Sequence, residues 1–445
     1  MIWLLQLLEE SNKKDNYMKY ILLNIAVFLL LVSFNCSPTS PTPIKDVELT
    51  VSDVSCTEAW LHLTVNNLSR NTQVQLVRNS NIVNTFDINS SDTTIYDDSL
   101  SSNKTYSYQV VELQNGMTAA KSEIIAAKTM DTTSSNFTWQ TYILGDGNSS
   151  TINDVAIVND TLAYAVGAIY YKDSTEQFDP LPYNLIVWDG KNWSLKKATV
   201  NFRGSKVTSS IEGIFIFSNT DIWLMATDPI LGDGINWIDY DIRNIIGNNS
   251  ITISKCWGKN NNNIFFIGNL GNIVHYYNDT WQKIESGTTL NITDVYGSPN
   301  SSDIYASLYN TSSSLAGHDL LKITNNNRVY NLTTPNNLYE ASSLWVDNKD
   351  ILFIVGSGLF RKAYGNWKEI NEFKMKSLTG IKANGLNDIF VIGSTRSGHF
   401  NGKTWTIYNG LNFTSGLYYS IDFKNNMVII AGYYGTRAII TVGIR

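Results

Sequence analysis

Eight residues of this sequence combine the side-chain types that recognise sugars and peptides. They are Tyr170, Tyr171, Asp179, Asp228, Asp233, His318, Arg396 and Arg437. Six of them fall in three long polar segments, residues 168–184, 228–236 and 309–319, and the two arginines belong to shorter loops. Aromatic faces beside carboxylates and amides are typical of pockets formed by converging loops. We therefore predict a binding site for a glycan or a protein ligand. The alternative is that these segments are merely long loops rich in Asn and Ser.

The sequence lacks the common motifs for catalysis or metal binding. It contains no HExxH, GxSxG or P-loop pattern and no Asp-rich calcium loop. It has no CxxC pair and no Cys/His cluster for a metal, and Cys56 and Cys256 fit small buried hydrophobic residues. His275 and His399 lie at the ends of strand-like runs, where we expect structural histidines with satisfied hydrogen bonds. The sequence therefore predicts no enzyme activity, no cofactor and no metal.

A repeat of roughly 40 residues supplies the elements that would position the eight residues. Its clearest copy is NDIFVIGSTRSGHFNGKTW, residues 387–405. The residues just before the hydrophobic run mark seven copies: Asp160, Asp221, Asn263, Asp303, Asp350, Asp388 and Asn426. About four strand-like runs per copy are typical of a β-propeller blade, so the predicted fold class is all-β. The loops between the second and third strands of the blades would open around the mouth of the central channel.

The last copy of the repeat lacks a fourth strand, and the segment before the first copy can supply it. Residues 137–144, FTWQTYIL, carry Trp139 where other copies have a tryptophan in their fourth strand. If this segment pairs with the sheet that holds Ile429, the ring closes and no sheet edge stays exposed. The sequence therefore predicts a seven-bladed β-propeller over residues 137–445, closed by an N-terminal velcro strand.

The repeat units also carry a family resemblance. Four copies have a tight turn followed by a tryptophan, which we expect to pack between adjacent blades: Trp193, Trp281, Trp367 and Trp405. The tandem NDIF[VI]G and NG-x-W units resemble those of uncharacterised bacterial surface propellers and, more distantly, sialidase-like and photosystem II assembly-factor-like propellers. The resemblance implies the fold but not the function, because propellers host many activities. A sialidase-like enzyme would need Asp boxes, whereas the nearest strings, at 189–193 and 233–237, fit ordinary hairpins.

Residues 45–130 form a separate segment of short strand-like runs divided by turns. This alternation predicts a small β-sandwich. Leu100 and Tyr106 resemble the fibronectin type III pattern Leu-x-Pro-x-Thr-x-Tyr, although Ser102 and Lys104 replace its Pro and Thr. The resemblance implies a tyrosine corner, in which the Tyr hydroxyl bonds to upstream backbone, and a domain that acts as a spacer or docking module.

Residues 1–36 predict a secretory signal, with translation starting at Met18. Cys36 follows an apolar run, residues 21–34, that is too short to span a membrane comfortably. This arrangement resembles a bacterial lipoprotein signal and implies that Cys36 is acylated, while residues 37–44, rich in Pro, Ser and Thr, form a tether. We expect a protein anchored through lipid to the outer membrane of the cell envelope, or a secreted protein if Cys36 is not acylated.

The overall composition bears on the class of partner. The formal net charge is −6, whereas a nucleic-acid-binding surface is strongly basic, so we expect no nucleic-acid partner. We also expect a monomer. The predicted function is that of a non-catalytic, lipid-anchored envelope protein whose propeller binds a glycan or a protein. An assembly or scaffold factor of the envelope is the first alternative, and a glycan-active, sialidase-like enzyme is the second.

Overall fold

The computed structural model describes residues 47–66, 68, 72–202, 204–247, 252–298, 302–312, 316–348 and 350–445. The predicted signal, the tether and Cys36 lie outside these residues. The chain forms two compact units, one of residues up to Thr50 with His62–Thr93 and Ser107–Ile125, the other of Val51–Leu61, Thr94–Tyr106 and Ala126–Arg445. Strands dominate, and the described residues contain one short α-helix, α2 (Arg243–Ile246). An all-β fold is therefore confirmed.

The first eight strands form two sheets. The strands are β1 (Val47–Val54), β2 (Ala59–Val65), β3 (Gln73–Arg78), β4 (Asn81–Asp87), β5 (Asp92–Asp97), β6 (Thr105–Gln114), β7 (Met117–Lys121) and β8 (Ile125–Lys128). One sheet has the order β1-β2-β5 and the other β4-β3-β6-β7, with β8 also paired to β6. Alternate residues of β2 and β3 are buried, which gives each of these strands one apolar face. The hydroxyl of Tyr106 accepts a hydrogen bond from the backbone N–H of Ser101 at 2.9 Å, the contact that a tyrosine corner requires.

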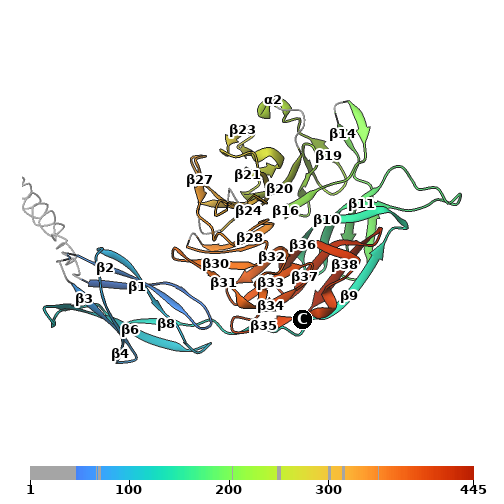
Figure 1. Ribbon diagram of the computed structural model, residues 1–445. Helices are drawn as coiled ribbons and strands as arrows, with labels where there is room; N and C mark the ends of the chain where they lie inside the picture. Colours follow the sequence, from blue (N-terminus) through green and yellow to red (C-terminus); the bar gives the residue numbers. More distant parts are fainter. Residues whose placement is uncertain are drawn as a thin grey trace, which may run out of the picture. The chain divides into compact units, whose positions relative to one another are not determined.

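Seven sheets of the described residues contain four antiparallel strands each (Figure 1). The first three sheets are β10 (Gly147–Asn159), β11 (Leu162–Tyr170), β12 (Tyr183–Trp188), β13 (Trp193–Lys196); β16 (Gly213–Ser218), β17 (Asp221–Met225), β18 (Pro229–Gly232), β19 (Trp237–Asp239); and β20 (Ile253–Asn260), β21 (Asn263–Gly268), β22 (Asn272–Tyr277), β23 (Thr280–Glu285). The hairpin β14 (Val200–Phe202)–β15 (Ser205–Val207) lies between the first and second of them.

The next four sheets complete the set. They are β24 (Asn291–Gly297), β25 (Ile304–Tyr309), β26 (Leu320–Ile323), β27 (Val329–Leu332); β28 (Ser343–Asn348), β29 (Ile351–Val355), β30 (Leu359–Ala363), β31 (Asn366–Glu369); β32 (Leu378–Gly385), β33 (Asp388–Gly393), β34 (Gly398–Phe400), β35 (Trp405–Ile407); and β36 (Gly416–Lys424), β37 (Met427–Tyr434), β38 (Arg437–Ile444), β9 (Thr138–Leu144). The second strands β29 and β33 are buried along their whole length, as expected for strands covered on both faces.

The first strands of the seven sheets contact one another in a closed cycle. Each of β10, β16, β20, β24, β28 and β32 packs against the first strand of the following sheet, and β36 packs against β10. A cycle of four-stranded sheets around a shared axis is the architecture of a β-propeller. The predicted propeller fold is therefore confirmed, and the first strand of each sheet lines the central channel.

The repeated tryptophans pack between neighbouring sheets, as predicted. Trp281 packs in a cluster that contains Trp223 of β17 and Phe266 of β21, and Trp405 packs with residues of both the β28–β31 and β32–β35 sheets. Trp193 and Trp367 occupy similar inter-sheet clusters. The second sheet, which has no clear fourth strand in its sequence, forms a short one, β19.

The segment around Trp139 is the fourth strand of the last sheet. Strand β9 pairs antiparallel with β38, with Thr138 opposite Ile444 and Leu144 opposite Ala438, in the sheet that also holds Ile429 of β37. The predicted pairing is confirmed. A glycine is required at position 443, because a Cβ there would lie 2.4 Å from a ring carbon of Trp139.

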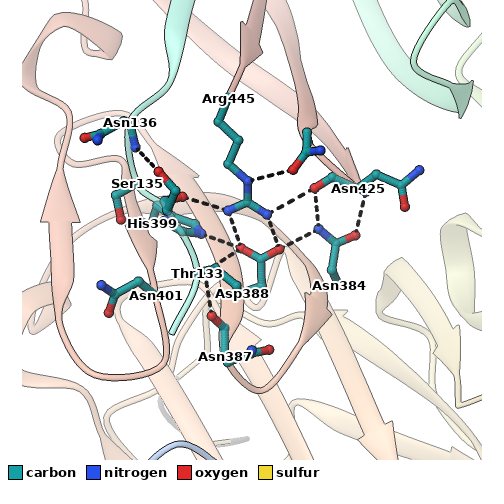
Figure 2. A network of polar contacts seen from close by, with 12 residues as sticks. Thr133, Ser135, Asn136, Asn384, Asn387, Asp388, His399, Asn401, Asn425 and Arg445 are labelled. Atoms are coloured by element: carbon teal, nitrogen blue, oxygen red, sulfur yellow. Dashed lines mark hydrogen bonds and ion pairs between the residues drawn. The ribbon is translucent and has the colours of Figure 1, made fainter. Parts of the chain in front are cut away.

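A network of polar contacts lies beside the paired strands β9 and β38 that close the ring (Figure 2). The guanidinium of Arg445, which follows β38, donates to both carboxylate oxygens of Asp388 at 2.7 and 2.6 Å. His399 Nε2 lies 2.7 Å from Asp388 Oδ1, and its Nδ1 lies 2.8 Å from Oγ of Ser135, which precedes β9. We call Asp388, His399, Arg445 and Ser135 the closure network. It connects the last two sheets with the strand that completes the ring, and it confirms that His399 is a structural histidine.

The charge of Asp388 is held by its partners. Only 5% of its side chain is exposed, and burial alone would raise its pKa. Hydrogen bonds from His399 and Arg445 outweigh burial and lower the pKa of Asp388 to about 2. The carboxylate is therefore ionised at neutral pH and contributes to stability only while its partners are present.

We expect the substitution Arg445→Met to destabilise the propeller by about 3 kcal/mol at pH 7, because it leaves the buried carboxylate of Asp388 without its cation. Urea unfolding followed by tryptophan fluorescence measures the change. Arg437→Met is the matched control, because Arg437 lies exposed at the other end of β38. Equal unfolding midpoints for the two variants would contradict the proposed importance of the network.

We also expect the cost of Asp388→Asn to depend on pH. The folded pKa of Asp388 is about 2, below the ordinary value of 3.8, so its stabilising effect is complete above about pH 4 and is lost as the pH falls toward 2. The difference in free energy of unfolding between the wild type and Asp388→Asn should therefore shrink over that interval. A difference that stays constant from pH 7 to pH 2.5 would show that the carboxylate does not titrate as described.

Candidate functional site at the channel mouth

The channel mouth is the end of the propeller at which the first strands of the sheets begin. Near this end, five of the first strands contain a register shift, or β-bulge, at one residue each: Asn153, Ser254, Thr293, Thr379 and Tyr419. A bulge leaves its residue outside the regular pairing and redirects its side chain. All five bulge residues carry a polar group, so the channel mouth has a repeated ring of polar side chains.

Three of these bulge residues, and Ser342 just before β28, connect one sheet to the next. Each donates a hydrogen bond to a backbone carbonyl near the start of the first strand of the following sheet. The bonds are Asn153 to Ile211 at 3.0 Å, Thr293 to Ala341 at 2.7 Å, Ser342 to Leu378 at 2.8 Å and Thr379 to Tyr418 at 2.7 Å. The ring of polar residues therefore has a structural role between sheets, and its rigid geometry also shapes the mouth.

Deeper in the channel, carboxylates continue this pattern. Asp154 accepts a hydrogen bond from the backbone N–H of Ile214 at 3.0 Å, and Asp294 accepts one from Leu344 at 3.2 Å. Asp422 Oδ2 accepts a bond from the N–H of Ile157 at 2.6 Å. In each case the donor belongs to the first strand of the next sheet in the cycle. Three aspartates thus use the same inter-sheet contact.

Two lysines balance these carboxylates. Lys255 Nζ lies 2.5 Å from Asp154 Oδ1. Burial opposes the charge of Lys382, but the nearby carboxylates of Asp294 and Asp422 attract it and raise the pKa of Lys382 above its ordinary value. Burial also opposes the charge of Asp422 and therefore raises the pKa of this carboxyl group. The channel interior therefore contains a network of opposite charges that supports the first strands.

A depression of about 550 Å³ opens at the mouth, above the junction of β10, β16, β36 and β37. Tyr419 and Tyr433 lie on one side of it with ring centroids 5.4 Å apart and ring planes at 33°. Asn153 and Glu212 lie on another side, with Asn153 Nδ2 and Glu212 Oε2 3.5 Å apart. Burial, and to a smaller extent Tyr433, raises the pKa of Tyr419, so the Tyr419 hydroxyl stays protonated near neutral pH. The depression thus offers aromatic faces, an amide and a carboxylate.

The predicted site residues lie in several different loops and strand ends. Tyr170, Tyr171 and Asp179 belong to the end of β11 and the loop after it, as predicted, and Asp179 pairs with Lys197 at 2.5 Å. Arg437 begins β38, next to Gly435 of the depression. The lining of the depression within the described residues includes none of the eight predicted residues.

Three further predicted residues lie in the expected loops but take different environments. Asp228 lies between β17 and β18, is 2% exposed and accepts a hydrogen bond from the backbone N–H of Ile242, so its carboxylate supports the loop. Arg396, between β33 and β34, donates to the carbonyl oxygen of Glu372 at 2.6 Å. His318 is exposed in the loop before β26.

The placement of Asp233 at the mouth is wrong. The segment predicted as one long loop, residues 228–236, contains strand β18 (Pro229–Gly232), so Asp233 falls in the turn between β18 and β19 at the opposite end of the sheet. There its side chain accepts hydrogen bonds from the backbone of Ile235 and Asn236. The sequence of this segment contains a proline and two glycines, and it therefore predicts a loop rather than a strand, because both residue types are typical of turns.

The bulge residues and the tyrosine pair were missed by sequence reasoning. Tyr419 and Tyr433 fall within strand-like runs rather than loops, and a register shift leaves no mark in hydrophobic periodicity. A signal was nevertheless present: a polar residue follows a hydrophobic one at the same place near the start of several first strands, as in Ile152-Asn153, Ile292-Thr293 and Leu378-Thr379.

The closure network contains a serine, a histidine and an aspartate in contact, which is the composition of a nucleophile triad. However, both carboxylate oxygens of Asp388 accept hydrogen bonds from Arg445. The imidazole of His399 is fully buried, and its ring centroid lies 5.4 Å from that of Phe137. These contacts assign the network to ring closure. In the part of the chain that the structure describes, no group of His, Cys, Asp and Glu residues could hold a metal ion. No helix among those residues is long and apolar enough to cross a membrane.

Comparisons with known proteins bear on the fold. No family model and no curated protein matches the chain. Two solved structures of YCF48 are similar to it, each with a TM-score of 0.50 and 69% of this chain covered: YCF48 bound to a D1 peptide, 14% identical with 95% of its chain covered, and YCF48 from Cyanidioschyzon merolae, 12% identical with 98% covered. The extracellular domain of the hybrid two-component system BT3049 from B. thetaiotaomicron is also similar, with a TM-score of 0.41, 12% identity and coverage of 89% of this chain and 69% of that one. The likeness to YCF48 supports the propeller resemblance seen in the sequence, and at these identities it concerns the fold alone.

We expect Lys382→Met to destabilise the propeller by about 2 kcal/mol, because Asp294 and Asp422 would lose the cation that they share. Urea unfolding at pH 7 measures this change. Lys424→Met, at an exposed position at the end of β36, should cost much less. If both variants unfold at the same midpoint, the channel charges do not support the first strands.

Proposed function

We propose that this protein is a non-catalytic binding protein of the bacterial cell envelope whose propeller takes a glycan or protein ligand at the channel mouth. One observation carries the proposal: the tyrosine pair Tyr419–Tyr433 lies in an open depression beside the polar groups of Asn153 and Glu212. Aromatic faces combined with a few fixed polar groups are the usual composition of a ligand pocket. The loop residues Tyr170, Tyr171 and Arg437 would extend the contact area.

The proposal includes a finer architecture. The seven four-stranded sheets would be seven blades, with β9 as the velcro strand. The two sheets of β1–β8 would form a fibronectin type III-like domain, which the strand orders β1-β2-β5 and β4-β3-β6-β7 and the Tyr106–Ser101 contact favour. Acylation of Cys36 would anchor the protein in the outer membrane. The sandwich would then separate the propeller from the anchor.

An assembly or scaffold role is the second candidate. One of the similar YCF48 structures holds a D1 peptide, so a propeller of this general form can accommodate a peptide. In this case the ligand at the mouth would be a segment of another envelope protein. Both candidates use the same depression, and only the first of them can take a glycan.

We expect Tyr419→Ala and Tyr433→Ala each to weaken ligand binding about tenfold or more, because aromatic residues at the centre of a contact contribute most to its affinity. The full chain, extracted in mild detergent, is applied to a glycan array and a peptide array, and the affinity of each hit is then measured for the wild type and both variants.

Tyr330→Ala is the matched control. Tyr330 is 48% exposed on the outer strand β27, whereas Tyr419 is 44% exposed at the mouth, so both substitutions remove similar exposed surface. A ligand whose affinity falls equally in all three variants would contradict the assignment of the site. Peptide hits without glycan hits favour the scaffold candidate, and the absence of any hit would contradict both candidates.

A further inference from the structure

A second cavity lies at the other end of the first strands, between the β20–β23 and β24–β27 sheets. Its volume is about 750 Å³, and its lining includes Phe265, His275, Tyr277, Gln282 and Asn327. It borders the ends of the strands that are remote from the channel mouth. The proposed function at the mouth therefore does not use it.

The floor of this cavity is one row of cross-strand neighbours. Trp257, Phe265, His275 and Gln282 stand opposite one another on successive strands of the β20–β23 sheet. The His275 imidazole stacks on the Phe265 ring with centroids 4.0 Å apart, and its Nε2 lies 2.9 Å from Oδ1 of Asn263. Burial lowers the pKa of His275, so its ring is neutral at pH 7.

The β32–β35 sheet contains the same arrangement. There Phe390 stands opposite His399, as Phe265 stands opposite His275. His399 Nε2 bonds to Asp388, the first residue of β33, as His275 Nε2 bonds to Asn263, the first residue of β21. The two histidine rows are therefore equivalent parts of two sheets of the propeller.

In the β32–β35 sheet, however, this position is occupied by another part of the chain. Phe137 lies edge-on to His399 and to Phe390, with ring centroids 5.4 Å and 5.8 Å apart. Ser135, which Figure 2 shows near His399, bonds through its Oγ to the imidazole. The Arg445 guanidinium lies 5.2 Å from the centre of the Phe137 ring and pairs with Asp388. An extended segment with a phenylalanine and a serine thus covers the histidine.

In the β24–β27 sheet, Asn327 hydrogen-bonds to His275, but no phenylalanine takes the place of Phe137. Val329 begins β27 opposite Ile323, as Thr138 begins β9 opposite Ile444, so Arg328 corresponds to Phe137. Arg328 is exposed, and the turn that contains it is closed by a hydrogen bond from Thr324 N–H to the Arg328 carbonyl. His275 is only 7% exposed, but it lines the cavity, whereas Phe137 and Arg445 pack around the histidine row of the β32–β35 sheet.

We propose that this cavity binds an extended peptide segment of a partner protein that places an aromatic side chain against His275, in the way that Phe137 lies against His399. Asn327, Gln282 and Asn263 provide amide groups for the peptide backbone. The charge requirement differs between the two places. Lys259 lines the cavity, its described lining residues include no carboxylate, and Asn263 replaces Asp388, so the peptide needs no arginine and can carry an acidic residue.

The test uses the full chain and a fluorescein-labelled peptide with the sequence of residues 133–140, TSSNFTWQ. We expect fluorescence anisotropy to show binding, and a peptide with Ala in place of Phe to bind about tenfold to a hundredfold more weakly, because a buried aromatic side chain contributes roughly 1.5–3 kcal/mol. Equal binding of the two peptides would overturn the proposal.

The position of the peptide is tested with Thr280→Trp, which adds bulk at the rim of the cavity and should abolish binding. Thr404→Trp is the matched control, because Thr404 precedes Trp405 as Thr280 precedes Trp281, in the sheet whose histidine is already covered. If Thr404→Trp abolishes binding and Thr280→Trp does not, the peptide binds at the closure network and the proposal is wrong. Glycan binding that Thr280→Trp removes, or self-association that it removes, would also overturn the proposal, because the occupant would then be a sugar or a second copy of the chain.

A charge change gives a readout that loss of folding cannot imitate. Asn263→Asp recreates at this cavity the carboxylate that Asp388 provides at the closure network. We expect it to shift the preference between two otherwise identical peptides toward the one that carries an arginine beside the phenylalanine, by about two- to tenfold. An unchanged preference would show that the peptide does not lie next to residue 263.

Discussion

Pairing of β9 with β38 is the contact on which the rest of the propeller depends. A ring of sheets that each pack on the next is only as stable as its weakest junction, because an opened junction exposes strand edges on both sides. Here the junction has a complete antiparallel register from Thr138 to Leu144 and a buried ion pair, Asp388–Arg445, beside it. The depression at the channel mouth lies across β36, β37 and β10, next to this junction. Closure therefore also sets the distance between the groups that would contact a ligand.

The bulge position shows how one backbone feature can serve structure in several sheets and recognition in one. Thr293 and Thr379 use this position to donate a hydrogen bond to the following sheet. Tyr419 occupies it in the last sheet and lies beside Tyr433 on one side of the depression. The inter-sheet contact there passes to the next residue, since Ser420 Oγ donates to Asp154 Oδ1 at 2.6 Å. A large aromatic side chain can be placed at the mouth because its neighbour maintains the ring.

The sequence predicts those features that depend on repetition, and it misses those that depend on register. Hydrophobic runs preceded by Asp or Asn located the second strands of the sheets. The strand-like segment around Trp139 precedes the first repeat, and the missing fourth strand of the last repeat predicted where it pairs. The bulges depend on which backbone groups pair. Because the bulge residues are polar residues of different types, no single residue type marks the bulge position in the sequence. The error at Asp233 has a different origin: β18 contains a proline and ends in a glycine, so local composition favours a loop while the neighbouring strand β17 supplies the hydrogen bonds that make it a strand.

The two histidine rows share one arrangement of side chains but differ in what packs against it. Both rows place an imidazole beside a phenylalanine and bind its Nε2 to the first residue of the second strand. Where that residue is Asp388, a buried carboxylate needs a cation, and Arg445 brings the chain end and the Ser135–Phe137 segment with it. Where it is Asn263, no charge needs to be neutralised, and the imidazole can keep an open cavity above it without a buried, unpaired carboxylate. The two rows thus differ in electrostatics: the carboxylate of Asp388 is paired with Arg445, whereas the amide of Asn263 needs no cation.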